Sequence, residues 1–215
     1  MIEQYANINA CHRSAFYGHT AVVRELVSAG ADVNLRCNEG SSPLSVASHE
    51  GHTDCVRLLI EHGADVETRD DEGITPLYLA ARKGHFEVVQ FLIEQHADIN
   101  ACDSDGRSCL LTAAFNGHTD VVRALVSAGA DVNLQCNDGS SSLTAASQKG
   151  HNDIVEMLLD IGADTEIRDD AGSTALWCAA SFGLTAVLDA LISRGADADA
   201  ADYRFNYRHH FVKQP

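Results

Sequence analysis

The spacing of apolar residues between Glu67 and Ile99 predicts two short helices in succession. Thr75-Pro76-Leu77 has the order typical of a helix start: a hydroxyl side chain at the N-cap, a proline at the first helical position and an apolar residue behind it. Gly84-His85 ends this helix. The second helix carries the apolar stripe expected of a helix buried on one face, formed by Val88, Val89, Leu92 and Ile93. This stretch therefore predicts one turn–helix–helix unit.

The same pattern returns every 33 residues. Gly-Ala-Asp, or once His-Ala-Asp, begins at residues 30, 63, 96, 129, 162 and 195. Gly-His keeps a second register, beginning at residues 18, 51, 84, 117 and 150, and lapses only at Gly183-Leu184. A fixed period of about 20–50 residues is typical of solenoids, in which each unit packs on its neighbours. The two registers therefore predict an all-α solenoid.

The Thr-Pro-Leu start, the Gly-His pairs and the Gly-Ala-Asp-Val-Asn endings resemble the ankyrin repeat. The resemblance implies stacked helix-turn-helix units with projecting β-hairpin loops, and a concave groove that binds proteins. It divides the chain into a shortened N-terminal repeat or cap over 1–33, repeats over 34–66, 67–99, 100–132, 133–165 and 166–198, and an irregular tail over 199–215.

Three departures from the family pattern lead to expectations. The first unit is short, so we expect its second helix and only a stub of the first. The tail lacks the turn glycine, with Phe205 in its place. We expect a disordered or loosely packed tail; the alternatives are that its aromatic residues cover the last repeat, that another chain covers it, or that the array continues in a longer protein. No full repeat keeps the family histidine that links neighbouring loops; Ser45, Tyr78, Leu111, Thr144 and Trp177 replace it. We expect each lost hydrogen bond to lower stability by roughly 0.5–1.5 kcal/mol.

Charge narrows the class of partner. Asp and Glu number 31 against 15 Lys and Arg, a formal net charge of −16. This balance argues against nucleic acid and anionic lipid and favours a protein with a basic or mixed basic and apolar surface. No secretory signal or membrane-spanning apolar run is present, and the seven cysteines contain no Cys-x-x-Cys pair. We therefore expect a monomer with reduced thiols in the cytoplasm, with the nucleus as the alternative.

No catalytic, cofactor-binding or metal-binding residues are predicted. His49-Glu50-Gly51-His52 differs from the zinc-protease motif, because its second histidine comes one residue early and the two histidines do not share a helical face. The Gly-His histidines are expected to satisfy backbone groups at the turn between helices. No phosphate loop, dinucleotide fingerprint or Gly-x-Ser-x-Gly elbow occurs. We therefore expect a protein without enzymatic activity.

The repeat register predicts which residues face a partner at the loop tips and on the first helices. These residues are Arg36, Glu39, Arg69, Asp71, Glu72, Ile74, Tyr78, Arg82, Asp105, Arg107, Leu111, Phe115, Asp138, Lys149, Asp170, Trp177 and Phe182. The acids are expected to steer a partner and the aromatics to anchor it. The alternative is a structural segment of a larger ankyrin array whose activity lies in other domains.

Overall fold

The computed structural model describes residues 10–198, and the chain divides between Ser104 and Asp105 into two compact units. All regular structure in the described residues is helical, apart from isolated bridge residues at Cys102 and Ser108. The all-α prediction is therefore confirmed. The loops expected to be β-hairpins contain no extended strand in this part of the chain. They close through single hydrogen bonds such as Asp70 N–H to the Ile74 carbonyl, at 3.1 Å.

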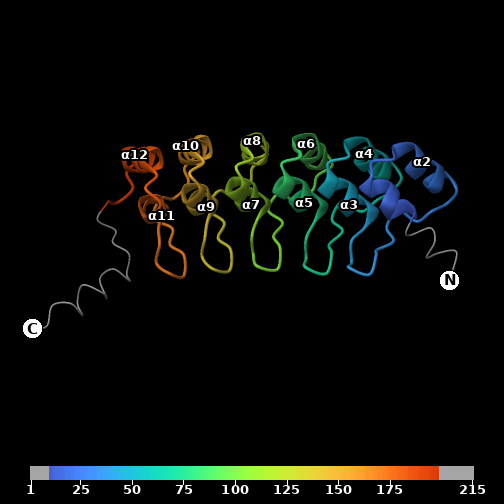
Figure 1. Cartoon of the computed structure of the whole chain (residues 1–215), viewed down its shortest axis with the longest axis horizontal. Coiled ribbons are helices and arrows are strands. Elements are labelled where there is room, and N and C mark those ends of the chain that lie inside the picture. Colours follow the sequence, from blue (N-terminus) through green and yellow to red (C-terminus); the bar gives the residue numbers. More distant parts are fainter. Residues whose placement is uncertain (1–9, 199–215) are drawn as a thin grey trace, which may run out of the picture. The chain divides into compact units, whose positions relative to one another are not determined.

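The first unit contains three successive helix pairs. A helix over residues 10–16 precedes α2 (Thr20–Ser28); α3 (Pro43–Glu50) pairs with α4 (Thr53–Glu61), and α5 (Pro76–Lys83) pairs with α6 (Phe86–Glu94). The first helices pack side by side, α3 on α5, while α4 packs on both α2 and α6. Figure 1 shows the long loops projecting on the side of α3 and α5.

The second unit repeats this arrangement. Its pairs are α7 (Cys109–Asn116) with α8 (Thr119–Ser127), α9 (Ser142–Lys149) with α10 (Asn152–Asp160), and α11 (Ala175–Ser181) with α12 (Thr185–Ser193). Helix α9 packs between α7 and α11, and α10 contacts both α8 and α12. Within this unit too, Figure 1 shows the loops on the side of the first helices.

Local sequence explains where the first helices begin and end. The Thr75 hydroxyl accepts a hydrogen bond from Tyr78 N–H, and Pro76 occupies the first helical position, as predicted. Gly84 closes α5 in the left-handed conformation, with φ of 80°. A serine or threonine caps each of the other first helices from α3 to α11 in the same way. The stripe of α6 is buried at Val88, Val89 and Leu92.

The shortened first repeat keeps more structure than predicted. The expectation of only a stub was wrong, because residues 10–16 are helical and residue 10 lies 33 positions before Pro43. The repeat therefore keeps its first helix in register. The same register places His12 where the family histidine stands, and its Nε2 donates to the Ser41 carbonyl at 2.9 Å. The view that the linking histidine is lost throughout was therefore also wrong.

The expectations for the tail, including a covering of the last repeat, concern residues 199–215, which lie outside the described residues. Within α12, Val187 and Leu191 are fully buried, whereas Ile192 is about half exposed.

Replacing His96 with glycine is expected to stabilise the first unit. Among the described residues, His96 is the non-glycine residue with positive φ, at 65°, where the other repeats carry glycine. An L-residue in this conformation costs about 1–2 kcal/mol, partly offset by the larger unfolded-state entropy of glycine. We expect His96→Gly to raise the free energy of unfolding by about 0.5–1 kcal/mol in urea titration. An equal gain from His96→Ala, which keeps the Cβ, would contradict this reason.

Candidate partner-binding groove

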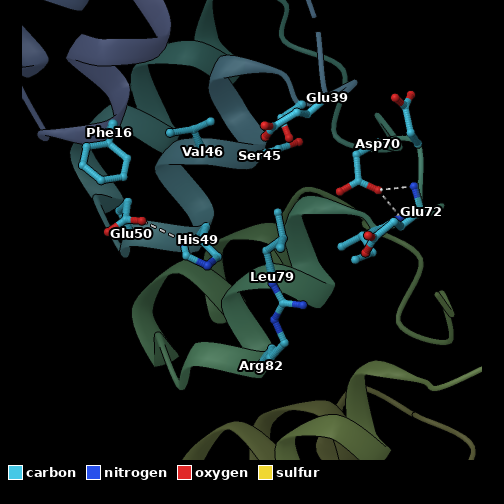
Figure 2. A pocket seen from close by; sticks show the side chains of 13 residues that line it. Phe16, Glu39, Ser45, Val46, His49, Glu50, Asp70, Glu72, Leu79 and Arg82 are labelled. Atoms are coloured by element: carbon cyan, nitrogen blue, oxygen red, sulfur yellow. Dashed lines mark hydrogen bonds and ion pairs between the residues drawn. The ribbon is translucent and has the colours of Figure 1, made fainter. Parts of the chain in front are cut away.

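A groove of about 480 Å³ lies in the first unit, between the projecting loops and the first helices. We call it the acidic groove. It is lined by Phe16 of the first helix; Glu39 and Ser41; Ser45, Val46, His49 and Glu50 of α3; Asp70, Asp71, Glu72 and Ile74; and Leu79 and Arg82 of α5. Figure 2 shows Phe16, His49 and Glu50 on one side, Glu39, Asp70 and Glu72 on the opposite side, and Leu79 between them. Five of the 13 lining residues carry carboxylates.

The apolar part of the groove comes from the first helices, where Phe16 and Val46 are at least partly exposed and Leu79 adds only a small surface, 6% exposed. Phe16, His49 and Arg82 follow one another at intervals of 33, and Val46 and Leu79 share a second register one helical turn earlier. The Phe16 side chain is 47% exposed although it is aromatic. Residues three apart lie on the same helix face, so α3 and α5 each add two side chains of these registers to the groove wall. The Phe16 ring packs edge-on against Tyr17, with ring centres 5.0 Å apart, and its exposed part remains open to a ligand.

The acidic part consists of loop residues with different degrees of engagement. Asp70 Oδ1 accepts hydrogen bonds from the backbone N–H groups of Glu72, at 3.0 Å, and Ile74, at 2.9 Å, and so shapes the loop. Asp71 lies 3.7 Å from the Arg36 guanidinium. The exposed side chains of Glu39 and Glu72 have no ion-pair partner among residues 10–198. These two carboxylates can therefore attract a basic side chain.

At the other side of the groove, the polar side chains already contact one another or an aromatic ring. His49 Nδ1 lies 2.7 Å from Glu50 Oε1, and both side chains are about one-third exposed. The Arg82 guanidinium carbon stands 5.9 Å from the centre of the Tyr78 ring. The groove thus has one side with an aromatic ring and a cation and an opposite side that is acidic. A ligand that combines an apolar group with a cation fits this arrangement.

Two arginines predicted to contact a partner also connect the loops. Arg36 Nε donates to the Gly40 carbonyl at 2.5 Å, and its Nη2 donates to the Arg69 carbonyl of the next loop. Arg69 donates in the same manner to the carbonyls of Gly73, at 3.0 Å, and Cys102, at 3.4 Å. Both remain exposed, so a partner can still reach them. Their hydrogen bonds hold successive loop tips at a fixed spacing.

The Gly-His histidines fix the row of side chains at the end of the first helices. His52 Nε2 donates to the Phe16 carbonyl and His85 Nε2 to the His49 carbonyl, each at 2.9 Å. In the second unit His151 does the same to Phe115, at 3.2 Å. For these three histidines, the expectation that they satisfy backbone groups is confirmed. Each bond crosses to the preceding repeat and so positions Phe16 and His49 beside the groove.

Three of the predicted contact residues are buried. Ile74, Tyr78 and Leu111 are only 4%, 3% and 5% exposed. Ile74 lines the acidic groove with little surface, while Leu111 packs with Cys136 and Ala145 inside the second unit. The prediction that these side chains are exposed was wrong. Tyr78 and Leu111 share the 33-residue register and lie on α5 and α7, which pack on the neighbouring first helices α3 and α9. Ile74 is buried in the loop before α5.

Tyr78 takes over the linking role of the family histidine. Its hydroxyl donates to Asp103 Oδ2 of the next loop at 2.7 Å, a short bond to a charged acceptor. The expected loss of stability at this position is therefore offset by a different side chain. Ser45, in the same register, instead contacts the Ser42 hydroxyl at 3.1 Å, and Thr144 forms a capping box with Ser141.

Removing the Tyr78 hydroxyl is expected to destabilise the first unit. Tyr78→Phe keeps the buried ring but leaves Asp103 without this donor, and hydrogen bonds to charged groups contribute about 1.5–3 kcal/mol. Because water can reach Asp103, we expect a loss of about 1–2 kcal/mol in urea-induced unfolding. Tyr17→Phe, which removes the hydroxyl of an exposed tyrosine, serves as the control. An unchanged unfolding midpoint for Tyr78→Phe would show that this bond adds nothing.

In the second unit, several predicted contact residues interact with each other. Arg107 Nη1 lies 2.8 Å from Asp105 Oδ2. Lys149 Nζ stands 4.3 Å from the centre of the Phe115 ring, which is 39% exposed. The sequence predicted these residues as separate contacts, whereas the structure joins them in pairs on the surface of this unit.

Asp138 also has a structural role. A hydrogen bond from the Cys136 thiol at 2.9 Å and another from the Ser140 N–H at 3.0 Å lower the pKa of Asp138. Burial, followed by the same hydrogen bond, raises the pKa of the Cys136 thiol. Of the remaining predicted contacts, Asp170 and Phe182 are exposed and Trp177 is half-buried. The acids at the loop tips are therefore not an equivalent series.

Other chemistry receives no support from the described residues. Between residues 10 and 198, no group of three or more His, Cys, Asp or Glu side chains is arranged to hold a metal ion. The seven cysteines are free thiols, and burial raises the pKa of Cys178 to about 11, far from the low values of reactive thiolates. In the same range, no helix combines the length and hydrophobicity needed to cross a membrane.

The residues predicted from the sequence include five of the 13 that line the acidic groove and miss Phe16, Val46, Asp70 and Leu79 in particular. A signal for these residues was present. Phe16 lies in the 33-residue register of Phe115 and Arg82, both of which were predicted, and Val46 and Leu79 precede His49 and Arg82 by one helical turn. The register of Phe16 was missed because the first repeat was interpreted as lacking most of its first helix.

Helix pairs that recur every 33 residues, with projecting loops beside the first helices, define an α-helical repeat protein. A family model described as ankyrin repeats, in three copies, matches residues 11–103, 66–136, 83–169 and 110–202. The chain belongs to the ankyrin-repeat family, whose repeats are generally protein-interaction modules without catalytic activity. Comparison with curated protein sequences gives no match.

Proposed function

We propose that this chain binds a partner protein through the acidic groove, by a segment that carries basic side chains next to an apolar or aromatic one. The observation that supports this most directly is the groove itself: about 480 Å³ of space, five lining carboxylates and an aromatic ring left 47% exposed. Exposed aromatic side chains in concave sites are common binding hot spots. Catalysis has no part in this function.

Charge supports the same kind of partner. The chain carries a formal net charge of −16, and Glu39 and Glu72 face the groove without an ion-pair partner in the described part of the chain. Such a field speeds the approach of a cationic surface, while apolar contacts with Phe16, Val46 and Leu79 slow its release. The braced loops favour a groove that is already formed before the partner binds.

A synthetic peptide tests this proposal directly. The basic probe peptide alternates arginine and phenylalanine with serine spacers and carries a fluorescent label; a control peptide has glutamate in place of arginine. We expect saturable binding of the basic probe by fluorescence anisotropy and no binding of the acidic control. If the basic probe did not bind, the proposal would be contradicted.

Phe16→Ala is expected to lower the affinity for the basic probe about fivefold, since loss of an aromatic contact costs about 1 kcal/mol. The variant should fold normally, because this ring is about half exposed. Phe182→Ala, which removes an exposed ring outside the acidic groove, is the matched control and should leave the affinity unchanged. Equal losses from the two variants would place binding elsewhere.

A further inference from the structure

The sequence of this chain contains one segment with the chemistry that the acidic groove fits. Residues 203–215, which lie outside the described residues, contain Arg204, Arg208 and Lys213, two histidines and four aromatic residues, and no acid. Aromatic and basic residues alternate in Tyr203-Arg204-Phe205 and in Tyr207-Arg208. Against a chain with 31 acids and 15 bases, this segment is a marked reversal of charge.

We propose that residues 203–213 of one copy of the chain dock in the acidic groove of a second copy, and that this self-association competes with partner binding. The inference rests on the proposed function of the groove and names one occupant for it. Arginine side chains pair with Glu39 and Glu72, while an aromatic ring of the segment contacts Phe16. The groove belongs to the unit of Met1–Ser104, whereas the sequence of the segment falls in the other unit, Asp105–Pro215.

The energetics predict a weak association. Two molecules of net charge −16 repel each other over long range, but at about 0.15 M salt the Debye length is about 8 Å. Screening at that distance suppresses repulsion between whole molecules more than attraction between groups in contact. The interaction joins two different surfaces of the chain, so it does not require a two-fold axis. Self-association should therefore depend on concentration and weaken as salt rises further.

Sedimentation velocity of the full chain tests the inference, with loading concentrations from about 10 to 500 µM chosen for a weak complex. We expect the weight-average mass to rise with concentration above the 23.0 kDa of a single chain. Reversal of the segment in Arg204→Glu/Arg208→Glu/Lys213→Glu should abolish this rise, as should reversal of the groove in Glu39→Lys/Glu72→Lys. Glu87→Lys/Glu94→Lys changes the net charge as much as the groove variant but on exposed positions of α6, and should still self-associate.

An equimolar mixture of the segment variant and the groove variant gives the sharpest result. Neither variant should associate alone. In the mixture, the native segment of the groove variant can dock in the native groove of the segment variant, so the mass should rise again. A wild-type chain that stays at 23.0 kDa, or a mixture that stays monomeric, would overturn the inference. Binding of the basic probe peptide to the segment variant separates the two proposals: if the probe binds while the wild type is monomeric, only the self-association is wrong.

Discussion

Reversing Glu39 and Glu72 together to lysine is expected to raise the dissociation constant of the basic probe peptide about 30-fold. Each exposed ion pair contributes about 0.2–1 kcal/mol, and reversal replaces each attraction with a repulsion of similar size. The two changes together then amount to about 2 kcal/mol, or roughly 30-fold in affinity. Neither carboxylate belongs to an ion pair in the described part of the chain, so the fold should be unaffected.

Fluorescence anisotropy at two salt concentrations measures this effect. The difference between wild type and variant should shrink when salt rises from about 0.05 to 0.5 M, because screening weakens exposed charge pairs. Glu87→Lys/Glu94→Lys adds the same charge on α6 and serves as the control, with an expected change below threefold. If the control lowers the affinity for the probe as much as the groove variant does, the effect comes from net charge alone and does not locate binding in the groove.

Gly51→Ala is expected to lower the free energy of unfolding by about 3 kcal/mol. Gly51 closes α3 with φ of 78°, a conformation that costs an L-residue about 1–2 kcal/mol. A Cβ at this position would also lie 2.5 Å from Nδ1 of His85. The imidazole must then move, and its hydrogen bond to the His49 carbonyl, worth about 0.5–1.5 kcal/mol, is lost.

Gly63→Ala is the matched control for this prediction. Gly63 has a similar φ of 86°, but nothing lies within 4 Å of a Cβ built there. We therefore expect a loss of only about 1 kcal/mol, from the backbone conformation alone. Urea titration of both variants measures the difference. Equal losses would show that the contact between Gly51 and His85 contributes no stability, and that these histidines do not hold successive repeats together.

Most of the fold could be predicted from the sequence because its signals are local and repeated. The cap at Thr75, the proline after it and the glycine at the helix end act within a few residues, and the period of 33 extends each prediction to the other repeats. The prediction failed for the first helix, which carries no Thr-Pro-Leu start. Its register has to be carried back from Pro43 to residue 10, which also identifies His12.

The groove was harder to predict because exposure depends on packing between repeats. Tyr78 and Leu111 occupy the register of residues that face the groove, yet the neighbouring first helix buries both. Arg36 and Arg69 look like partner contacts in the sequence, but each donates to carbonyl groups of its own and the next loop. Only the structure distinguishes these arginines, which are hydrogen-bonded within the loops, from Glu39 and Glu72, which have no ion-pair partner in the described part of the chain.

The most direct test of the central claim is a map of chemical shift changes in the methyl groups of the protein when the basic probe peptide is added. Val46 and Leu79 line the acidic groove from α3 and α5, and their methyl groups report on contact without any mutation. We predict that the largest, saturable changes occur at these two residues. Changes confined to the methyl groups of the second helices, such as Ile60 in α4 and Ile93 in α6, would contradict the assignment of the groove as the binding site.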